Sequence, residues 1–471
     1  MSSDSRKLAL GDIVDITSSK RIFRREYVKS GVPFYRGKEI IEKSSGNEPS
    51  TDIFITEERF EEIKKKHGVP QPREILLTSV GTLGVPYQVQ DGEKFYFKDG
   101  NLTWIKDFSE EVLPEFILVW LKSPKADEQI RKITIGSTQQ ALTITSLKTL
   151  ELDLPTKEEQ RLICDHYFTL SDKIELNRQT NETLEAMAQA IFKSWFVDFD
   201  PVRAKIEATS AGRDPNRAAM AAISACTKVS ADGAVLWEET EAALQQKLDR
   251  MSADQRTQLR QTAELFPGEL VKSEIGEVPK GWEYDQLGNF ITVKRGGSPR
   301  PIKDFVVEEG LHWTKISDAT SENSPFIMTT KEFIKEDGLK KTVLLEKGSL
   351  ILSNSATPGL PKFLNIDACI HDGWLYFPEQ EHFTDLYLYH LFIEIRKALV
   401  AKGSGTVFTN LKTSILRNYD VVVPNGELVI KFTEVAHSIF DSLLNNREET
   451  ESLTKLRDTL LPKLISGEFE L

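Results

Sequence analysis

The chain carries one sequence pattern twice, and this duplication constrains its fold more than any other feature. Residues 136–155 read GSTQQALTITSLKTLELDLP, and residues 405–424 read GTVFTNLKTSILRNYDVVVP. The two segments are 269 residues apart at both ends, and the same offset relates Asn177-Arg178 to Asn446-Arg447. A gap-free match over such a span predicts two copies of one architecture in a single chain.

Upstream of each matched segment the repeat is looser. Leu10-Gly11 resembles Leu287-Gly288, residues 75–79 resemble 350–354, and residues 99–102 resemble 372–375. Short β-rich runs alternate with Gly, Pro, Ser and Asn turns, and amphipathic helices are expected near residues 114–121 and 384–399. The fold class is therefore predicted to be α+β, with two mixed globular heads at residues 1–155 and 276–424.

Each head is followed by a segment with the spacing of a long helix, residues 156–202 and 425–471. Apolar or packing residues recur at alternating steps of four and three, which is the spacing of a coiled-coil seam. In the first helix they are Ile163, Tyr167, Leu170, Ile174, Asn177, Asn181, Leu184, Ala188, Ile191 and Trp195. In the second they are Phe432, Ala436, Ile439, Leu443, Asn446, Thr450, Leu453, Arg457, Leu460 and Leu464.

Polar residues interrupt both seams at equivalent points, Asn177 with Asn181 and Asn446 with Thr450. A buried polar residue in a seam costs stability and can fix register or orientation. We therefore expect the helices to pair antiparallel with these four residues close together, which gives the chain a pseudo-two-fold internal symmetry. The alternative is that each seam only wraps onto the heads.

Residues 203–275 have no counterpart in the second half and are predicted to be a helical insertion or linker. Helices are expected at residues 215–225 and 252–266, with Ser252 as the N-cap of the latter. Just before this insertion, the string Asp198-Phe199-Asp200-Pro201 is interpreted as a helix terminus, with Pro201 as the stop signal.

Composition narrows the class of protein. The sequence is 39% hydrophobic and 28% charged, its N-terminus lacks the apolar core of a signal peptide, and no stretch is apolar enough to span a bilayer. The three cysteines, Cys164, Cys226 and Cys369, have no metal-ligand spacing and fit a reducing compartment. We therefore expect a cytoplasmic protein without a metal site, whose Cys164 and Cys226 are helix-packing residues.

Catalytic patterns are missing or weak. The sequence has no G-x-x-x-x-G-K-[ST] phosphate loop and no H-E-x-x-H helix, and residues 198–201 lack the second proline and aromatic of an adenine methyltransferase motif. His371 beside Asp372 could suggest acid–base chemistry, but a hydrogen-bonded histidine at a turn is the simpler interpretation. No catalytic residue is predicted.

The heads instead offer groups that read DNA. Arg and Lys suit guanine and phosphates, Asn and Gln suit adenine, and Ser and Thr suit either base edges or phosphates. The net charge of −12 argues against DNA binding unless such groups are locally concentrated. The candidates in the first head are Lys20, Arg21, Arg24, Arg25, Arg36, Lys38, Thr78, Ser79, Thr82, Ser137, Thr138, Gln139 and Gln140. Those in the second head are Lys294, Arg295, Ser298, Arg300, Lys303, Lys315, Ser353, Asn354, Ser355, Thr357, Lys362, Thr406, Thr409 and Asn410. The alternative is that these residues form ordinary solvated loops and surface charges.

Taken together, these features resemble the specificity subunits of type I restriction–modification systems, and the resemblance covers nearly the full length of the sequence. The resemblance is sharpest at Leu154-Pro155, Glu159-Gln160, residues 184–188 and residues 191–203, which read IFKSWFVDFDPVR. Residues 36–40, 276–282, 296–299 and 465–468 support it. The first head departs from the pattern, with Ser18-Ser19-Lys20-Arg21 where the second has Gly-Gly-Ser-Pro, and this departure leaves individual base contacts open.

The resemblance implies a non-catalytic subunit of a methyltransferase and endonuclease complex. Each of two target-recognition domains would read half of a split, asymmetric site in double-stranded DNA, and the antiparallel helices would set the unread gap. Two methylation subunits and the restriction subunits would dock on this chain. S-adenosylmethionine, ATP and Mg²⁺ would belong to those partners, and this chain would bind no cofactor. The other hypotheses are a self-sufficient DNA-modifying enzyme and a scaffold whose heads bind protein.

Overall fold

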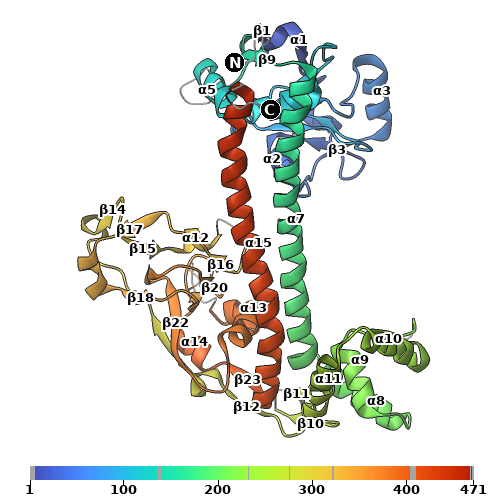
Figure 1. Cartoon of the computed structure of the whole chain (residues 1–471), viewed down its shortest axis with the longest axis vertical. Coiled ribbons are helices and arrows are strands. Elements are labelled where there is room, and N and C mark those ends of the chain that lie inside the picture. The colour runs from blue at the N-terminus through green and yellow to red at the C-terminus, as the bar shows by residue number, and fades with distance from the viewer. Residues whose placement is uncertain are drawn as a thin grey trace. The chain divides into compact units, whose positions relative to one another are not determined.

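The computed structural model describes residues 6–134, 141–231, 233–274, 276–320, 323–403, 410–466 and 468 (Figure 1). The chain forms two compact units, one of Met1–Thr180 with Asn446–Leu471 and one of Asn181–Asn445. Each unit contains one mixed head and parts of two long helices, so the predicted α+β class is confirmed.

The head of the first unit is built on two sheets. The four-stranded sheet has the order β2-β8-β5-β6, formed by Asp15–Thr17, Leu102–Lys106, Ile75–Thr78 and Pro86–Gln88, with every pair antiparallel. The three-stranded sheet has the order β4-β3-β7, formed by Phe54–Ile55, Val32–Tyr35 and Tyr96–Phe97, with β3 parallel to β7. A separate antiparallel pair joins β1 (Arg6–Ala9) to β9 (Glu151–Leu154), which closes the head at its two ends.

Short helices complete this head. They are α1 (Leu10–Ile13), the 3-10 turn η1 (Arg24–Glu26), α2 (Gly37–Ser44), α3 (Glu57–His67), α4 (Pro114–Leu121), α5 (Pro124–Ile133) and α6 (Ile144–Lys148). The expected helix at residues 114–121 is present as α4, but it is not amphipathic. Phe116 through Leu121 are all buried, because α4 forms the centre of the core between the sheet and the long helices.

The head of the second unit is larger and has the same plan. Its first sheet has the order β13-β22-β19-β20-β16, formed by Ile291–Arg295, Trp374–Gln380, Leu350–Ser353, Pro361–Leu364 and Phe326–Ile327. Its second sheet has the order β14-β17-β15-β21-β18, formed by Val306–Val307, Glu332–Ile334, Leu311–Thr314, Ala368–Ile370 and Val343–Leu345. The closing pair joins β12 (Glu283–Gln286) to β23 (Asp420–Val423). The helices are η2 (Leu287–Asn289), η3 (Ile302–Asp304), α12 (Ile316–Thr320), η4 (Glu336–Lys341), α13 (Asp385–Gly403) and α14 (Thr413–Arg417).

The two heads are therefore structural copies, as the sequence repeat predicts. The order β2-β8-β5-β6 corresponds to β13-β22-β19-β20, and the parallel pair β3–β7 corresponds to β15–β21. Two glycines show how close the copy is. A Cβ on Gly11 would lie 2.8 Å from the Cβ of Lys148, and one on Gly288 would lie 2.7 Å from the Cβ of Arg417. Both copies need glycine there because a short helical turn packs directly on the helix that precedes the closing strand.

The two long helices, α7 (Lys157–Phe196) and α15 (Gly426–Ser466), pack together and run antiparallel (Figure 1). In the first unit the ring of Tyr167 meets Arg457, and the amide of Asn177 donates to the carbonyl of Asn446. In the second unit, Asn181 donates to the carbonyl of Leu443 at 3.1 Å. Residue numbers rise along α7 as their partners' numbers fall along α15, so the predicted antiparallel pairing is confirmed.

The polar positions of the seam are hydrogen-bonded. Asn177 is 2% exposed, and its amide donates to Glu449 at 2.7 Å as well as to Asn446 at 3.4 Å. The hydroxyl of Thr450 donates to the carbonyl of Asn446 within α15. In the second unit the seam also packs on the head through Phe192 and Tyr387, whose ring centroids are 5.0 Å apart. Pairing of the helices and wrapping onto a head therefore occur together.

The segment without a repeat is a small helical subdomain in the second unit. It contains α8 (Asp200–Ser210), α9 (Pro215–Ile223), α10 (Trp237–Asp249), α11 (Ala253–Leu265) and a hairpin of β10 (Leu270–Ser273) with β11 (Gly276–Pro279). Both helices expected there are present, and Ser252 caps α11, because its hydroxyl accepts from the backbone N–H of Gln255 at 3.2 Å. The prediction that Pro201 ends the long helix is wrong. The long helix ends at Phe196, and Pro201 lies in the first turn of α8, where its missing N–H has no helical partner to lose.

Candidate nucleic-acid interface

A basic loop of the first head links β2 to β3. Lys20, Arg21, Arg24 and Arg25 are all exposed, and among the described residues no carboxylate lies within salt-bridge distance of Arg24 or Arg25. Two contacts attach this loop to the core of the head: the N–H of Lys20 donates to the Tyr96 hydroxyl at 2.6 Å, and the side chain of Ile22 is buried. These cations are therefore presented to solvent on a well-held backbone, which suits contact with phosphates.

The second head presents a different basic loop after β13, organised by Asp372. The hydroxyl of Ser298 donates to the Asp372 carboxylate at 2.6 Å, the guanidinium of Arg300 lies 3.6 Å from it, and Arg295 donates to the Asp372 carbonyl. Partial burial acts to raise the pKa of Asp372, but the Ser298 hydrogen bond and the nearby cations hold it below its ordinary value. The carboxylate therefore stays charged and positions the loop.

Two other candidates flank this loop, one in β13 and one in η3. Lys294 and Lys303 are exposed. His371 accepts a hydrogen bond from the N–H of Gly373 at 2.8 Å, and burial lowers its pKa although Asp372 opposes the shift. It therefore acts as a neutral histidine at a turn, which agrees with the simpler interpretation of the sequence.

Five candidates need correction because their side chains are buried. Thr78, Ser79, Ser353, Asn354 and Lys362 are between 0% and 5% exposed. The hydroxyl of Thr78 accepts from the N–H of Val85 at 2.9 Å, and that of Ser353 accepts from the N–H of Leu360 at 2.8 Å. The same bond thus closes the same hairpin in both heads.

The remaining three buried side chains are also used internally. Ser79 pairs with Thr103, Asn354 donates to the carbonyl of Asp372, and Lys362 donates to the carbonyl of Ser324. Prediction of direct DNA contact is wrong for these five side chains, because they hold strands and turns inside the heads. A polar string between two apolar runs does not reveal which of its members face inward.

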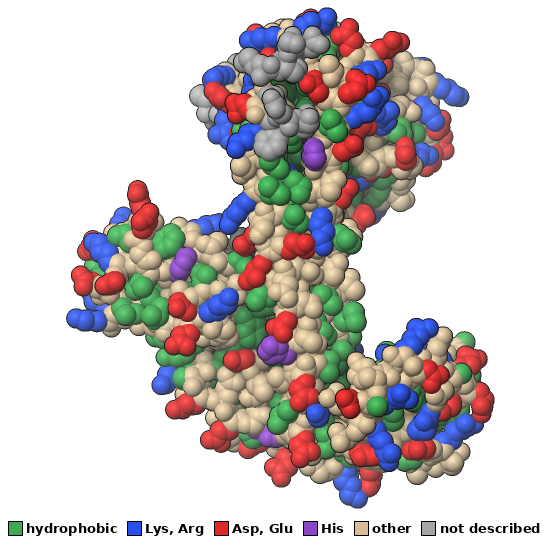
Figure 2. Space-filling view, in the orientation of Figure 1, with side chains coloured by type: hydrophobic (Ala, Val, Ile, Leu, Met, Phe, Trp, Pro, Cys, Tyr) green, Lys and Arg blue, Asp and Glu red, His purple; other side chains and the backbone are tan. Residues whose placement is uncertain are grey.

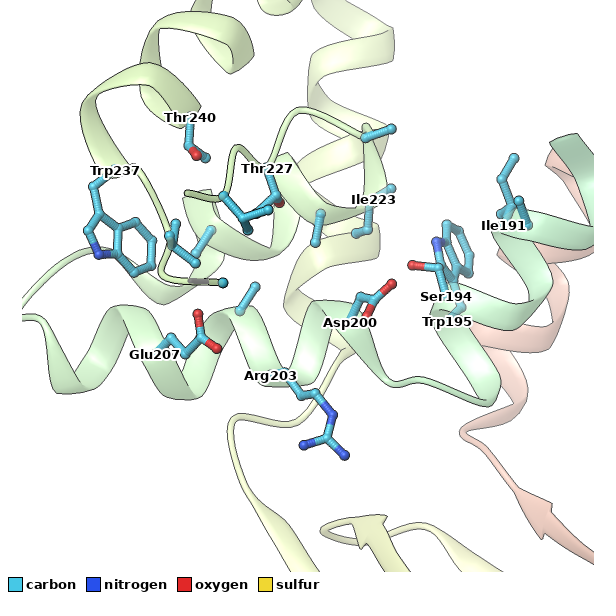
Figure 3. A pocket seen from close by; sticks show the side chains of 18 residues that line it. Ile191, Ser194, Trp195, Asp200, Arg203, Glu207, Ile223, Thr227, Trp237 and Thr240 are labelled. Atoms are coloured by element: carbon cyan, nitrogen blue, oxygen red, sulfur yellow. The ribbon is translucent and has the colours of Figure 1, made fainter. Parts of the chain in front are cut away.

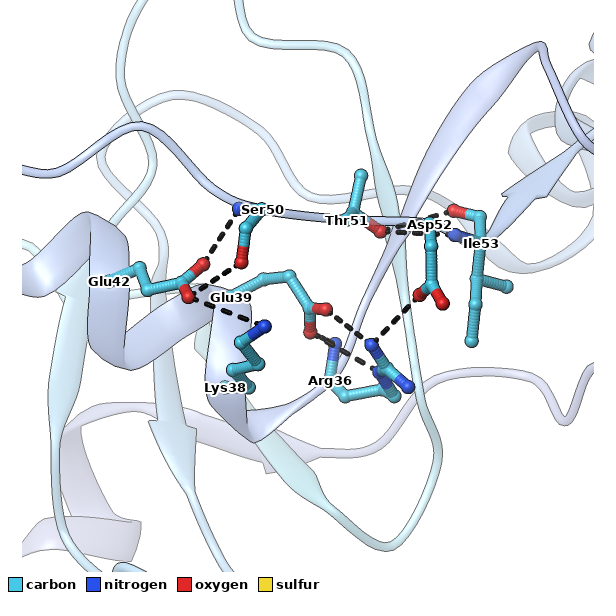
Figure 4. A network of polar contacts seen from close by, with 8 residues as sticks. All are labelled: Arg36, Lys38, Glu39, Glu42, Ser50, Thr51, Asp52 and Ile53. Atoms are coloured by element: carbon cyan, nitrogen blue, oxygen red, sulfur yellow. Dashed lines mark hydrogen bonds and ion pairs between the residues drawn. The ribbon is translucent and has the colours of Figure 1, made fainter. Parts of the chain in front are cut away.

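Arg36 is held in an internal ion-pair network (Figure 4). Its guanidinium donates to the fully buried Glu39 at 2.7 Å and to Asp52 at 3.2 Å, and its pKa is raised, chiefly by the Glu39 hydrogen bond. Lys38 is exposed but lies 3.7 Å from Glu42, and Lys315 is paired with Glu332. Arg36 and Lys315 therefore stabilise their own heads, and their charges are already compensated.

The remaining candidates divide by exposure. Thr82 and Asn410 are exposed, whereas Ser355 and Thr357 are half-buried. Ser137, Thr138, Gln139, Gln140, Thr406 and Thr409 lie outside the described residues. The accessible part of the predicted set is thus concentrated in the two basic loops.

Sequence reasoning missed Phe23 and the role of Asp372. Phe23 lies in the first basic loop and is 51% exposed. The sequence signal for the aspartate was the Asp-Gly pair shared by both heads, at residues 99–100 and 372–373. In the first head the equivalent Asp99 lies 3.9 Å from Arg21, so an aspartate faces the basic loop in each copy.

The distribution of charge on the surface favours attraction of phosphates by the cations of single loops rather than by the net charge of the chain. Basic and acidic side chains are interspersed over the face shown in Figure 2. Because exposed charges are screened within about 10 Å at moderate salt, the local cations of a loop outweigh the net charge of the chain for a bound phosphate.

No catalytic constellation emerges from the part of the chain that the structure describes. Within it, no group of three His, Cys, Asp or Glu side chains could hold a metal ion. Cys164, Cys226 and Cys369 are buried, and burial raises the pKa of Cys164 to about 12 and that of Cys369 to about 11, so these two thiols stay protonated. None of the described helices is long and apolar enough to cross a membrane.

A cavity of about 600 Å³ lies between the end of α7 and the helical subdomain (Figure 3). Trp195, Arg203, Glu207, Trp237 and Thr240 are among its lining residues. No histidine or cysteine is among its lining residues, and the carboxylates that line it are Asp200 and Glu207.

Duplicated heads with dissimilar basic loops, carried on paired helices, define a two-headed recognition protein rather than an enzyme with one active site. Comparison with known proteins gives the family. Residues 2–186 match the type I restriction modification DNA specificity domain. The type I restriction enzyme HindI specificity subunit of Haemophilus influenzae is 34% identical over 380 residues, which cover 76% of this chain and 78% of that protein. This chain belongs to the family of type I restriction enzyme specificity subunits, which are non-catalytic.

Two further comparisons agree. The MjaIX specificity subunit of Methanocaldococcus jannaschii is 24% identical over 370 residues, covering 76% of this chain and 70% of that protein. The crystal structure of a type I restriction–modification S subunit from M. genitalium matches 98% of this chain and 96% of its own with a TM-score of 0.54. At 15% identity, the latter supports the fold alone.

Proposed function

We propose that this specificity subunit reads a bipartite, asymmetric site in double-stranded DNA, with one half-site bound by each head. The observation that carries the proposal is that one scaffold occurs twice with different basic loops. The first head presents Lys20, Arg21, Arg24 and Arg25, whereas the second presents Arg295 and Arg300 around Asp372, with Lys294 exposed on β13. Equal scaffolds place the loops in equivalent positions, and unequal loops favour unequal half-site sequences.

The paired helices would set the unread gap between the half-sites. Helices of 40 and 41 residues are each about 60 Å long at 1.5 Å per residue, and antiparallel pairing would place equivalent ends of the two copies apart. Hydrogen-bonded Asn177 at the seam would fix the register and hence the gap.

Two methylation subunits and the restriction subunits are the proposed partners. The exposed apolar side chains Leu176 and Met187 on α7 and Leu456 on α15 are suitable for contact with such subunits. S-adenosylmethionine, ATP and Mg²⁺ would be bound by those partners, so the isolated chain should show no methyltransferase, nuclease or ATPase activity. Methyl transfer by the purified single chain, at a rate unaffected by added methylation subunit, would contradict this.

Mapping methylated adenines across the host genome, with and without this gene, tests the proposed function. The expected result is one split motif that is methylated only when the gene is present. Replacing residues 11–154 with another head should then change one half of the motif and leave the other half intact. Unchanged methylation without the gene, or a change in both halves after the swap, would refute the proposal.

The spacing proposal has its own test. Insertion of four residues after Arg178 and after Arg447, equivalent points of the repeat, lengthens each helix by about 6 Å. At 3.4 Å per base pair, the unread gap should widen by about two base pairs while both half-site sequences stay the same. An unchanged gap would show that the helices do not set it.

A further inference from the structure

The basic loop of the first head carries an exposed aromatic ring among its cations. Phe23 is 51% exposed, and it is the only phenylalanine among the exposed large hydrophobic side chains of the described residues. The guanidinium carbon of Arg21 lies 5.7 Å from the ring centroid and that of Arg25 lies 5.4 Å from it. An isolated exposed apolar side chain needs no explanation, but one contacted by two arginines in a basic loop is a different arrangement.

The backbone holds this ring in place. The N–H of Phe23 donates to the carboxylate of Glu26 at 2.8 Å, and the carbonyl of Phe23 accepts from the N–H of Glu26 at 2.8 Å. Glu26 in turn forms an ion pair with Arg59 of α3, 2.8 Å away. The preceding residue, Ile22, is 1% exposed and anchors the loop in the core of the head. Phe23 is thus presented to solvent by a rigid turn, so little conformational entropy remains to be lost when it binds.

The second head has no such ring at this point. Its loop reads Gly296-Gly297-Ser298-Pro299, and Pro299 is buried. The arginines of that loop are held by Asp372 instead of by an aromatic face. The two basic loops therefore differ in chemistry as well as in sequence, because an exposed phenylalanine contacted by two arginines is described in the first head alone.

We infer that Phe23 is an apolar base contact of the half-site read by the first head, and that Arg21 and Arg25 bind phosphates beside it. This inference rests on the proposed function. Phosphate binding alone would leave the ring in water, whereas contact with a base face or a thymine methyl group removes it from water. Aromatic side chains stack on bases, and phenylalanine contacts the thymine methyl in the major groove. Because phosphate contacts carry no sequence information, Phe23 would contribute specificity and the arginines would contribute affinity.

The test uses the full chain assembled with its methylation subunits and duplexes that carry the methylated motif. Fluorescence anisotropy measures the dissociation constant for this duplex and for a scrambled one at several salt concentrations. Phe23→Ala should weaken binding of the motif about 10-fold, with the scrambled duplex and the salt slope unchanged. Arg25→Ala should weaken binding of both duplexes and lower the salt slope by about 1.

Two controls separate a base contact from other effects. Phe23→Tyr keeps an aromatic ring and should bind within about threefold of the wild type. Leu339→Ala removes a side chain of the second head that is 40% exposed, and it should bind as the wild type does. If Phe23→Ala changes nothing, or weakens both duplexes equally, the inference is wrong, and Phe23 would then serve a protein contact or none.

The half-site can be tested in the same assay. In a duplex whose first half-site is scrambled, Phe23→Ala should cause no further loss, whereas the full loss should persist when only the second half-site is scrambled. The opposite pattern would overturn the assignment to the first head. If the wild-type complex does not distinguish the motif from the scrambled duplex, the proposed function itself fails, and that outcome is distinguishable from failure of the inference.

Discussion

Phe432 of α15 is the position where one substitution should weaken the packing of the long helices most. It is fully buried, and its ring centroid lies between 5.4 and 6.2 Å from those of five other aromatic side chains. These partners come from α7 and from α13 of the second head, namely Phe192, Trp195, Phe196, Tyr387 and His390. Phe432 therefore joins the two helices and the head into one core.

The expected cost follows from this environment. Truncation of a buried phenylalanine to alanine costs about 3–5 kcal/mol, and each aromatic pair contributes about 0.5–1.5 kcal/mol beyond its buried area. With five such pairs, Phe432→Ala should lie at the upper end, at about 4–5 kcal/mol. For a unit of this size each kcal/mol lowers Tm by about 2–4 °C, so Tm should fall by about 10 °C or more.

Calorimetry of the full chain measures this change as a shift in the transition of the second unit. The matched control is Ile430→Ala, two residues earlier on the same helix, because Ile430 is 54% exposed and should cost at most about 0.5 kcal/mol. A cost below about 1.5 kcal/mol for Phe432→Ala, or one equal to that of Ile430→Ala, would refute the assignment of Phe432 to the centre of this core.

Three other predictions concern stability. An added Cβ at Gly11 or Gly288 would lie 2.8 or 2.7 Å from the facing helix, so alanine at either position should lower the free energy of unfolding in urea by about 1–3 kcal/mol. Gly268→Ala, with open space around the added Cβ, should lower it less. A loss at only one of Gly11 and Gly288 would contradict their equivalence. Burial lowers the pKa of His390 to about 3 from 6.5, so its folded state resists protonation. The contribution of His390 to the free energy of unfolding should then be complete above pH 6.5 and should fall by up to about 1.4 kcal/mol per pH unit as the pH drops toward 3. The same dependence of the unfolding free energy on pH in a His390→Gln variant would count against this. Ser252→Ala removes the cap of α11 and should cost about 1 kcal/mol in the same assay, and no loss would mean that the cap is dispensable.

The sequence alone predicted the features that depend on spacing along the chain. The 269-residue repeat led to two heads of one topology, and the alternating four–three seam led to the antiparallel pair of α7 and α15. Ser252 was recognised as a cap because capping is a local matter, with the bond formed to a residue three positions away. Pro201 shows where such local reasoning reaches its limit, since the same residue can end one helix or begin the next.

The candidate site was predicted only in part. The exposed cations Lys20, Arg24 and Lys294 belong to the sequence-predicted set and do lie at the surface. Thr78 and Ser353 belong to it too, but they close hairpins inside the heads. Phe23 was absent from it, because a single phenylalanine in a sequence is expected to be buried.

Sequence by itself determined the duplication, the helix pairing and the two basic loops, because periodicity and repeats are written along the chain. Tertiary structure decided which polar side chains face inward, which charges are already paired and which ring stays exposed. The physical reason is that burial and pairing depend on neighbours distant in sequence: Lys315 is paired with Glu332, and the turn that presents Phe23 is fixed by the ion pair between Glu26 and Arg59. Those contacts exist only after the sheets have assembled.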